Sequence, residues 1–324
     1  MTIENRQSAI GNLQSKIAYI FPGQGSQFIG MGKELAENFP AARQVFEEAD
    51  AALDFPITRL CFAGTTEELE LTENTQPAIL TCSVAALRVM ETEAFPKADY
   101  VAGHSLGEYS ALIAAGALSF GEAVRTVRNR GRYMQAAVPV GKGAMAAVMG
   151  LSLGDIEKVC VEASEGQICA PANINTPNQV VIAGNTEAID RATELLKDLG
   201  AKRVIRLNVS APFHCALMMP AQERLAGDLA KLKLADLTVP LVTNVDAVGI
   251  STASQARESL IRQVSSPVRW LESIELLIRQ GVETFVEVGP GRVLSGLIRQ
   301  ISREVKCHNV GDSASLAAAG SALG

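Results

Sequence analysis

A serine between two glycines is the part of this sequence best suited to covalent chemistry. Residues 103–107 read Gly-His-Ser-Leu-Gly, a G-x-S-x-G pattern with Ser105 at its centre. The apolar residues 100–102 predict the end of a buried strand, and residues 108–118 predict a helix rich in Ala and Leu. A serine on such a turn projects its hydroxyl into open space, and the glycines permit the sharp bend. The pattern also occurs by chance, and Ser105 would then be only a small residue in a tight turn.

A serine hydroxyl is a weak nucleophile and needs a base within hydrogen-bond reach. The chain contains three histidines, His104, His214 and His308. His104 lies directly before Ser105 in the sequence, so its side chain points in a different direction from that of Ser105 at the turn. We expect His104 to line the rim of a pocket. His308 is near the C-terminus, where a solvated or structural role is expected. By elimination His214, in a proline-containing loop, is the candidate base, the alternative being a structural histidine.

An acyl-enzyme also needs two N–H donors for the oxyanion of its intermediate. We expect the backbone of Leu106, directly after the serine, to supply one of them. Gln24, in the glycine-rich loop 22–27 after a first predicted strand, is expected to supply the other. That loop could instead bind phosphate, but neither a Walker lysine nor G-x-G-x-x-G follows it.

A serine hydrolase would place an acid between Ser105 and His214 in chain order. The acids in this interval, such as Asp155 and Asp190, fall in a predicted inserted subdomain rather than at a strand end of the main sheet. This weakens the esterase interpretation. A backbone carbonyl can orient the histidine instead, because it suffices to fix the tautomer.

Arginines are concentrated on a helix predicted over residues 120–138. A bidentate arginine in the pocket would select a substrate that carries a carboxylate. The sequence pattern alone does not choose Arg130 over its neighbours, and most of these side chains are expected to be solvated or ion-paired. The arginines are Arg125, Arg128, Arg130 and Arg132.

Length and composition favour a folded α/β protein. The chain has 324 residues, of which 48% are hydrophobic and 20% charged, enough for a sizeable core. A net charge of −6 without a basic field argues against nucleic acid as a partner, and no apolar run reaches membrane-spanning length. Six cysteines without a C-x-x-C pair predict reduced thiols and a cytoplasmic location. We expect a monomer with no metal and no cofactor.

The order of predicted elements divides the chain. Residues 141–208 read β-α-β-β-α-β, the order of a ferredoxin-like subdomain, inserted into a second unit. Residues 16–140 and 209–311 form that unit, an α/β core with a parallel sheet. Residues 1–15 are expected to be a disordered leader, and residues 312–324 a flexible tail.

Taken together, these motifs resemble malonyl-CoA:acyl carrier protein transacylase of fatty-acid synthesis and the acyltransferase domains of polyketide synthases. They occur in the family's order and span nearly the whole chain. The matching segments are residues 21–27 (FPGQGSQ), 103–109 (GHSLGEY), 130–131 (RG), 173–184, 212–215 (PFHC), 266–270 (SPVRW) and 287–291 (EVGPG).

The resemblance implies a role for each matching residue. It implies Ser105 as the acylated nucleophile and His214 as its base, with the N–H groups of Gln24 and Leu106 holding the oxyanion. Arg130 would pair with the malonyl carboxylate. The implied fold is an α/β-hydrolase-like core with a ferredoxin-like subdomain, in agreement with the element order.

Further positions follow from the same resemblance. Gln263 falls where the family uses a backbone carbonyl to orient the histidine. Asn173 and Asn175 would line the cleft beside the arm of the thioester. Phe213 stands before the base, where a phenylalanine accompanies malonyl preference in polyketide acyltransferases and a serine accompanies methylmalonyl.

The implied partners are malonyl-CoA and holo acyl carrier protein, with transfer by a ping-pong mechanism through a malonyl-serine ester. The family's carrier is acidic while this chain is net negative, so a local basic patch is expected to steer the encounter. A serine esterase or thioesterase is the alternative activity, and a polyketide carrier is the alternative partner; a non-catalytic interaction module fits the motifs poorly. Candidates for the patch are Lys202, Arg203 and Arg206, with Arg128 or Arg132.

Overall fold

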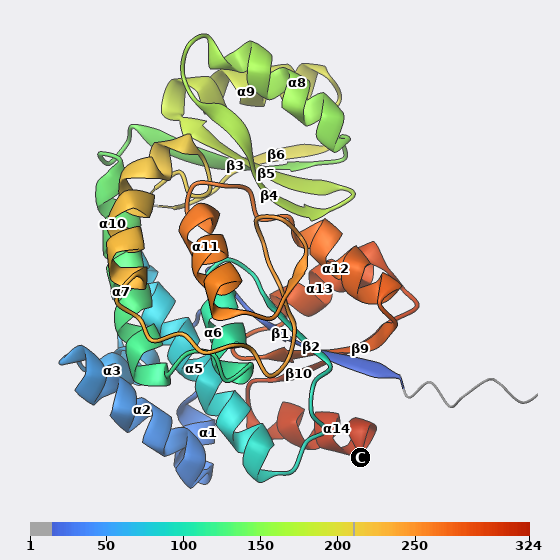
Figure 1. Ribbon diagram of the computed structural model, residues 1–324. Coiled ribbons are helices and arrows are strands. Elements are labelled where there is room, and N and C mark those ends of the chain that lie inside the picture. Colours follow the sequence, from blue (N-terminus) through green and yellow to red (C-terminus); the bar gives the residue numbers. More distant parts are fainter. Residues whose placement is uncertain (1–14, 210) are drawn as a thin grey trace, which may run out of the picture.

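The computed structural model describes residues 15–209 and 211–324. Its strands form two sheets, a six-stranded one in the body of the molecule and a four-stranded one at one end (Figure 1). The predicted leader, residues 1–15, lies outside the described residues except for Ser15.

The helices and strands follow the chain in three groups. The first contains β1 (Lys16–Phe21), α1 (Lys33–Asn38), α2 (Pro40–Leu53), α3 (Ile57–Ala63), α4 (Thr66–Glu70), α5 (Thr72–Thr92), β2 (Tyr100–Gly103), α6 (Gly107–Ala114) and α7 (Phe120–Ala137). The second contains β3 (Gly143–Met149), α8 (Leu153–Ser164), β4 (Cys169–Thr176), β5 (Gln179–Asn185), α9 (Thr186–Asp198) and β6 (Arg203–Arg206). The third contains the 3₁₀ turn η1 (Ala216–Met218), α10 (Met219–Leu229), β7 (Leu241–Val242), β8 (Gly249–Ile250), α11 (Ala253–Gln263), α12 (Trp270–Arg279), β9 (Val282–Val288), α13 (Val293–Ile301), β10 (Lys306–Val310) and α14 (Ser313–Leu323).

The larger sheet has the strand order β10-β9-β1-β2-β7-β8. Its neighbouring strands are parallel except for the antiparallel pair β7 and β8. Side chains of β1 alternate between two apolar layers: Tyr19 and Phe21 pack on one face, and Ala18 and Ile20 on the other. A parallel strand buried on both faces explains why this segment is apolar throughout.

Helices cover both faces of the larger sheet (Figure 1). Helices α5 and α6 belong to the layer that contains Phe21, whereas α12 and α13 belong to the opposite layer, in which Trp270 is fully buried. Because β1, β2, β7 and β9 run parallel, their carboxyl ends meet at one edge of the sheet. In open α/β sheets this edge is where ligands bind.

The smaller sheet has the order β4-β5-β3-β6 with antiparallel neighbours. Ala146 and Ile182 face α8 and α9, whereas Met145 and Val181 belong to the main core cluster on the other side. The sheet and its two helices lie within the predicted subdomain, residues 141–208. The predicted fold class is confirmed: an α/β-hydrolase-like core with a parallel sheet and a ferredoxin-like βαββαβ unit.

A short backbone bridge joins the two units. The Ile174 N–H donates to the carbonyl oxygen of Val268 at 2.9 Å, and the Val268 N–H donates to that of Ala172 at 2.9 Å. Strand β4 of the subdomain is thereby attached to the segment that precedes α12. This contact fixes the subdomain above the carboxyl edge of the larger sheet.

The C-terminal segment differs from the prediction of a flexible tail over residues 312–324. Asp312 caps helix α14, its Oδ1 accepting from the Ser315 N–H at 2.7 Å. Leu316 and Ala319 are buried in the main core cluster. The Ala, Gly and Ser composition predicts a flexible tail, but alanine favours helix once a cap and an apolar stripe are present.

None of the helices in residues 15–209 and 211–324 has the combination of length and apolar character needed to cross a membrane.

Candidate active site

Ser105 lies on a sharp turn between β2 and α6. Its backbone φ is 55°, in the left-handed region that residues other than glycine rarely adopt. A Cβ added to Gly103 would lie 2.0 Å from the carbonyl carbon of Gly107, and one added to Gly107 would lie 2.2 Å from the carbonyl oxygen of Phe21. Glycine is therefore required on both sides, and the strained turn has the form of a nucleophile elbow.

His214 reaches Ser105 from the loop between β6 and α10. Its Nε2 lies 2.7 Å from Ser105 Oγ, and its Nδ1 lies 2.9 Å from the carbonyl oxygen of Gln263. A carbonyl oxygen can only accept, so Nδ1 carries the proton and donates it. The lone pair of Nε2 is thus directed at the serine hydroxyl.

The surroundings of His214 keep its imidazole neutral. The side chain is buried, and this burial, followed by the positive charge of Arg130, lowers its pKa to about 3. The hydrogen bond to Gln263 opposes the shift only in part. At neutral pH the ring is therefore unprotonated and able to accept the proton of Ser105.

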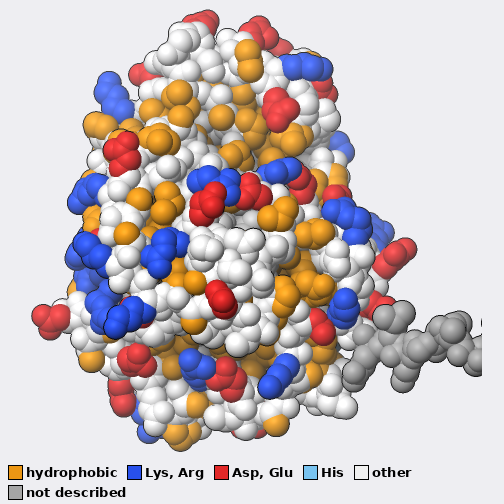
Figure 2. Space-filling view, in the orientation of Figure 1, with side chains coloured by type: hydrophobic (Ala, Val, Ile, Leu, Met, Phe, Trp, Pro, Cys, Tyr) orange, Lys and Arg blue, Asp and Glu red, His pale blue; other side chains and the backbone are white. Residues whose placement is uncertain are grey.

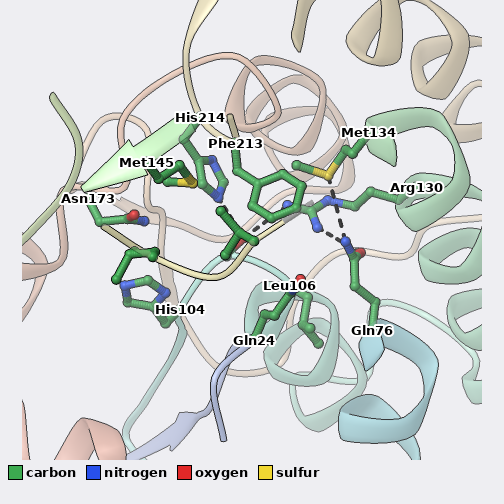
Figure 3. Close-up of a pocket in the computed structure, with 13 residues that line it drawn as sticks. Gln24, Gln76, His104, Leu106, Arg130, Met134, Met145, Asn173, Phe213 and His214 are labelled. Atoms are coloured by element: carbon green, nitrogen blue, oxygen red, sulfur yellow. Dashed lines mark hydrogen bonds between the residues drawn. The ribbon is translucent and has the colours of Figure 1, made fainter. Parts of the chain in front are cut away.

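The guanidinium of Arg130, on α7, also reaches the Ser105 hydroxyl. Figure 3 shows Arg130 and His214 extending into the cavity from different elements. The Nη2 atom of Arg130 donates to Ser105 Oγ at 3.0 Å and to Gln263 Oε1 at 3.0 Å. The Nη1 atom of Arg130 donates to Gln76 Oε1 at 2.7 Å. Its Nε has no hydrogen-bond partner among the described residues. Burial lowers the pKa of Arg130, but a guanidinium remains charged in proteins, so a buried cation lies beside the serine.

The two predicted oxyanion donors line the same cavity. In the described part of the chain, the backbone N–H groups of Gln24 and Leu106 have no hydrogen-bond acceptor. Gly23 brings the loop after β1 against the elbow, because a Cβ there would lie 2.5 Å from the carbonyl oxygen of His104. Two unoccupied N–H groups near a serine hydroxyl are what a tetrahedral oxyanion requires.

Comparison with known proteins gives the family of this chain. Residues 18–322 match the model of the acyl transferase domain. The chain belongs to this family. It is 50% identical to the malonyl CoA-acyl carrier protein transacylase of Bacillus subtilis (strain 168), over 92% of this chain and 94% of that protein.

Solved structures of other acyl transferases agree with this result. The malonyl CoA-acyl carrier protein transacylase of Coxiella burnetii has a TM-score of 0.94 at 45% identity, covering 95% of this chain and 98% of that one. A malonyl-transacylase solved in complex with a type II PKS acyl-carrier protein has a TM-score of 0.93 at 45% identity, covering 95% and 100% of the two chains.

The other predicted substrate-binding residues of this acyl transferase are only partly brought together. His104, Asn173 and Phe213 line the cavity. Asn175 is not among the lining residues; its Oδ1 accepts a hydrogen bond from His104 Nε2 at 3.0 Å instead. Burial lowers the pKa of His104, so its ring is also held neutral. Asn175 therefore orients a cavity wall rather than forming one.

The acyl transferase cavity has a volume of about 110 Å³ and lies between the core and the subdomain. The prediction missed its mainly apolar wall, because these residues come together only when α5, α7 and the subdomain pack. The missed lining residues are Gln76, Met134, Met145, Leu207 and Val209. In the described residues, no group of three or more His, Cys, Asp and Glu side chains is arranged to hold a metal ion.

A polar network beneath the elbow was also missed. Asn244 follows β7; its Oδ1 accepts from the Ser105 N–H at 2.6 Å and its Nδ2 donates to the Gly103 carbonyl at 2.7 Å. The side-chain Nε2 of Gln263 donates to the Ser105 carbonyl at 2.9 Å. These hydrogen bonds provide partners for backbone N–H and carbonyl groups of the strained turn, and they hold the turn in its conformation. The available signal was an asparagine at the carboxyl end of a parallel strand.

Proposed function

We propose that this acyl transferase moves the malonyl group of malonyl-CoA to the phosphopantetheine thiol of acyl carrier protein, in fatty-acid biosynthesis. One observation carries the proposal. The Ser105 hydroxyl lies 2.7 Å from a neutral base, His214 Nε2, and 3.0 Å from a buried cation, Arg130 Nη2. A base activates the nucleophile, and a cation at this place suits an acyl group that carries its own carboxylate. The names of the relatives reported above support the same activity.

In the first half-reaction, Ser105 Oγ attacks the thioester carbonyl of malonyl-CoA while His214 Nε2 takes the hydroxyl proton. The N–H groups of Gln24 and Leu106 hold the oxyanion of the tetrahedral intermediate. When the intermediate collapses, the C–S bond breaks and His214 returns the proton to the CoA sulfur. Arg130 holds the malonyl carboxylate in the ester that remains.

In the second half-reaction, the phosphopantetheine thiol gives its proton to His214 and attacks the malonyl-serine ester. Collapse of the second intermediate breaks the ester C–O bond, and the proton passes to Ser105 Oγ. The carbonyl oxygen of Gln263 keeps the imidazole in the required tautomer through both halves. Phe213, in the cavity wall, crowds an acyl group branched at the α carbon and so favours malonyl over methylmalonyl.

Mass spectrometry of the protein incubated with malonyl-CoA and holo carrier protein tests this function. The expected result is a malonyl mass on Ser105 that disappears as the same mass appears on the carrier. Malonate release without carrier loading would instead support the esterase alternative. Because a related structure contains a type II PKS carrier, fatty-acid and polyketide carriers form two arms, and the faster arm identifies the partner.

Docking of an acidic carrier is proposed to use positive charge near the cavity. Figure 2 shows Lys and Arg side chains gathered over α7 and α10. The previously suggested Arg206 and Arg132 are paired with Asp190 and Glu73, which reduces the field that they project. Transfer should slow as salt is raised, and salt-insensitive kinetics would contradict electrostatic steering.

We also propose that the protein acts as a cytoplasmic monomer without nucleic-acid or membrane partners. Its six cysteines are all free thiols, as in a reducing compartment, and its net charge is −6. Sedimentation at micromolar concentration checks the oligomeric state, with a dimer mass as the contradicting result.

A further inference from the structure

Glu108 is a buried carboxyl group that the mechanism above does not use. It lies in the first turn of α6 and is 1% exposed. Its Oε1 accepts from the backbone N–H of Asn244 at 3.1 Å, and its Oε2 accepts from the side-chain Nε2 of Gln263. Burial raises its pKa to about 8, whereas these two hydrogen bonds and the charge of Arg130 favour the ionised carboxylate, which accepts from both donors.

Gln263 is the residue through which Glu108 reaches the site. Its Nε2 donates to Glu108 and to the Ser105 carbonyl, while its Oε1 accepts from Arg130 Nη2 at 3.0 Å. An amide turned by 180° would point its oxygen at the Glu108 carboxylate, where two acceptors would face each other. Its NH₂ group would then point at the guanidinium of Arg130, where two donors would face each other. The carboxyl oxygen of Glu108 therefore selects one orientation of this amide.

We infer that Glu108 is a positioning residue for substrate selection: it fixes the side chain of Gln263, and Gln263 fixes the guanidinium of Arg130 that receives the malonyl carboxylate. The inference rests on the proposed function. The orientation of His214 does not depend on this side chain, because the imidazole donates to the backbone carbonyl of Gln263. The bond from Gln263 Nε2 to the Ser105 carbonyl serves every acyl group alike and so cancels in the ratio of malonyl to acetyl transfer. Glu108 should thus influence which acyl group is chosen more than whether acyl transfer occurs.

Glu108→Gln changes the hydrogen-bonding pattern with almost no change in shape. The Asn244 N–H belongs to the backbone and cannot reverse, so the new amide oxygen must stay beside it. The new NH₂ group then faces the NH₂ group of Gln263, and Gln263 either loses its bond or turns away from Arg130. A buried unpaired polar group corresponds to about a tenfold loss or more in kcat/KM for malonyl-CoA. The loss for acetyl-CoA, which has no carboxylate, should be much smaller.

Glu287 provides a matched control. It is also a fully buried carboxylate, but its oxygens accept from the N–H groups of Leu294 and Ser295 at 3.0 and 2.7 Å, at the start of α13 and away from the cavity lining. Glu287→Gln is expected to lower the unfolding temperature without changing the ratio of malonyl to acetyl transfer. This variant separates loss of a buried carboxylate from loss of the contact with Gln263.

A double-mutant cycle tests the path through Gln263. Gln263→Met removes the side-chain amide and keeps the backbone carbonyl that faces His214. We expect Gln263→Met to lower the malonyl-to-acetyl ratio as Glu108→Gln does, and the combination to cost no more than the larger single loss.

Equal losses for both acyl groups in Glu108→Gln, or additive losses in the double variant, would overturn the inference. If Glu108→Gln does not fold, Gln263→Met alone must lower the ratio, and an unchanged ratio refutes the inference. Failure of the unmodified protein to load malonyl onto the carrier refutes the proposed function instead, so the two failures are distinguishable.

Discussion

Replacing Arg130 by methionine tests the assignment of the buried cation most directly. Methionine keeps the length of the aliphatic stem and removes the guanidinium, so the cavity changes little in volume but loses its positive charge. The oxygens of Gln76 and Gln263 that accept from Arg130 at 2.7 and 3.0 Å lose their donor whichever substrate is bound. This cost is therefore common to malonyl and acetyl transfer.

The difference between the two substrates comes from the carboxylate. A guanidinium that holds a carboxylate with two charge-assisted hydrogen bonds contributes about 1.5–3 kcal/mol for each. Their loss lowers kcat/KM for malonyl-CoA by about 10²- to 10⁴-fold. Acetyl transfer bears only the common cost. That cost is offset because the charge of Arg130 is one of the causes that lower the pKa of His214 and its removal makes that base stronger, so acetyl transfer should be largely retained.

A competition assay measures this prediction without knowledge of the folded fraction. Malonyl-CoA and acetyl-CoA are mixed with holo carrier protein, and the two carrier products are quantified by mass in the same sample. Arg125→Met serves as the control, since Arg125 is an exposed arginine on the same helix. An equal fall for malonyl and acetyl in Arg130→Met would refute the carboxylate role and leave Arg130 as a structural residue.

Other predictions address the remaining parts of the site. Ser105→Ala should abolish the malonyl-enzyme mass and slow transfer by about 10³-fold or more, and near-normal transfer would contradict the nucleophile assignment. Phe213→Ser should raise methylmalonyl relative to malonyl transfer by about tenfold in the same competition assay. An unchanged ratio would show that the ring does not contact the acyl group. Gly23→Ala places a Cβ 2.5 Å from the His104 carbonyl, so it should displace the oxyanion loop and lower kcat by about 10²-fold, with little change in KM. Because the pKa of His214 is lowered to about 3, the acylation rate should show no inflection near pH 6.5 in stopped-flow measurements. Stability contributed by this group is complete above about pH 6.5 and is lost as pH falls toward about 3, since only the unfolded state binds the proton in that window.

Local patterns explain why the contact between Ser105 and His214 could be predicted from the sequence. The strand, turn and helix around Ser105 form from adjacent residues, and scarcity of histidine left His214 as the candidate base. The sequence also contained a pattern that distinguishes Arg130 from the other three arginines of this helix. Ala123, Val127 and Met134 are spaced at helical intervals from Arg130 and are buried with it, so this arginine falls on the apolar stripe of α7.

The residues that could not be predicted depend on contacts between distant elements. Asn244 and Glu108 are 136 positions apart in the chain, and Gln263 is joined to Glu108 across 155 positions. Each is an ordinary polar residue in its own helix or strand end. Their role arises only where α6, the end of β7 and α11 meet, so no local pattern indicates it. The C-terminal helix is the opposite case. Asp312 is a recognisable helix N-cap in the sequence, but the Ala, Gly and Ser composition of the segment predicts a flexible tail.

The group that orients His214 affects whether the malonyl-serine ester reacts with a thiol or with water. A carboxylate partner would stabilise the imidazolium that forms during catalysis, whereas the Gln263 carbonyl carries no charge, and burial with Arg130 lowers the pKa of His214 to about 3. Such a base removes protons from weak acids with difficulty. Ser105, itself a weak acid, reacts because its hydroxyl is held 2.7 Å from Nε2, whereas a water molecule would first have to be positioned there. A thiol, with a pKa near 8.5, is far more acidic than water, at about 15.7. We infer that this pairing disfavours hydrolysis of the malonyl-serine ester relative to attack by phosphopantetheine. It predicts that Gln263→Asp fails to convert the enzyme into a hydrolase, because the side chain of residue 263 points to Arg130 and Glu108 rather than to the imidazole.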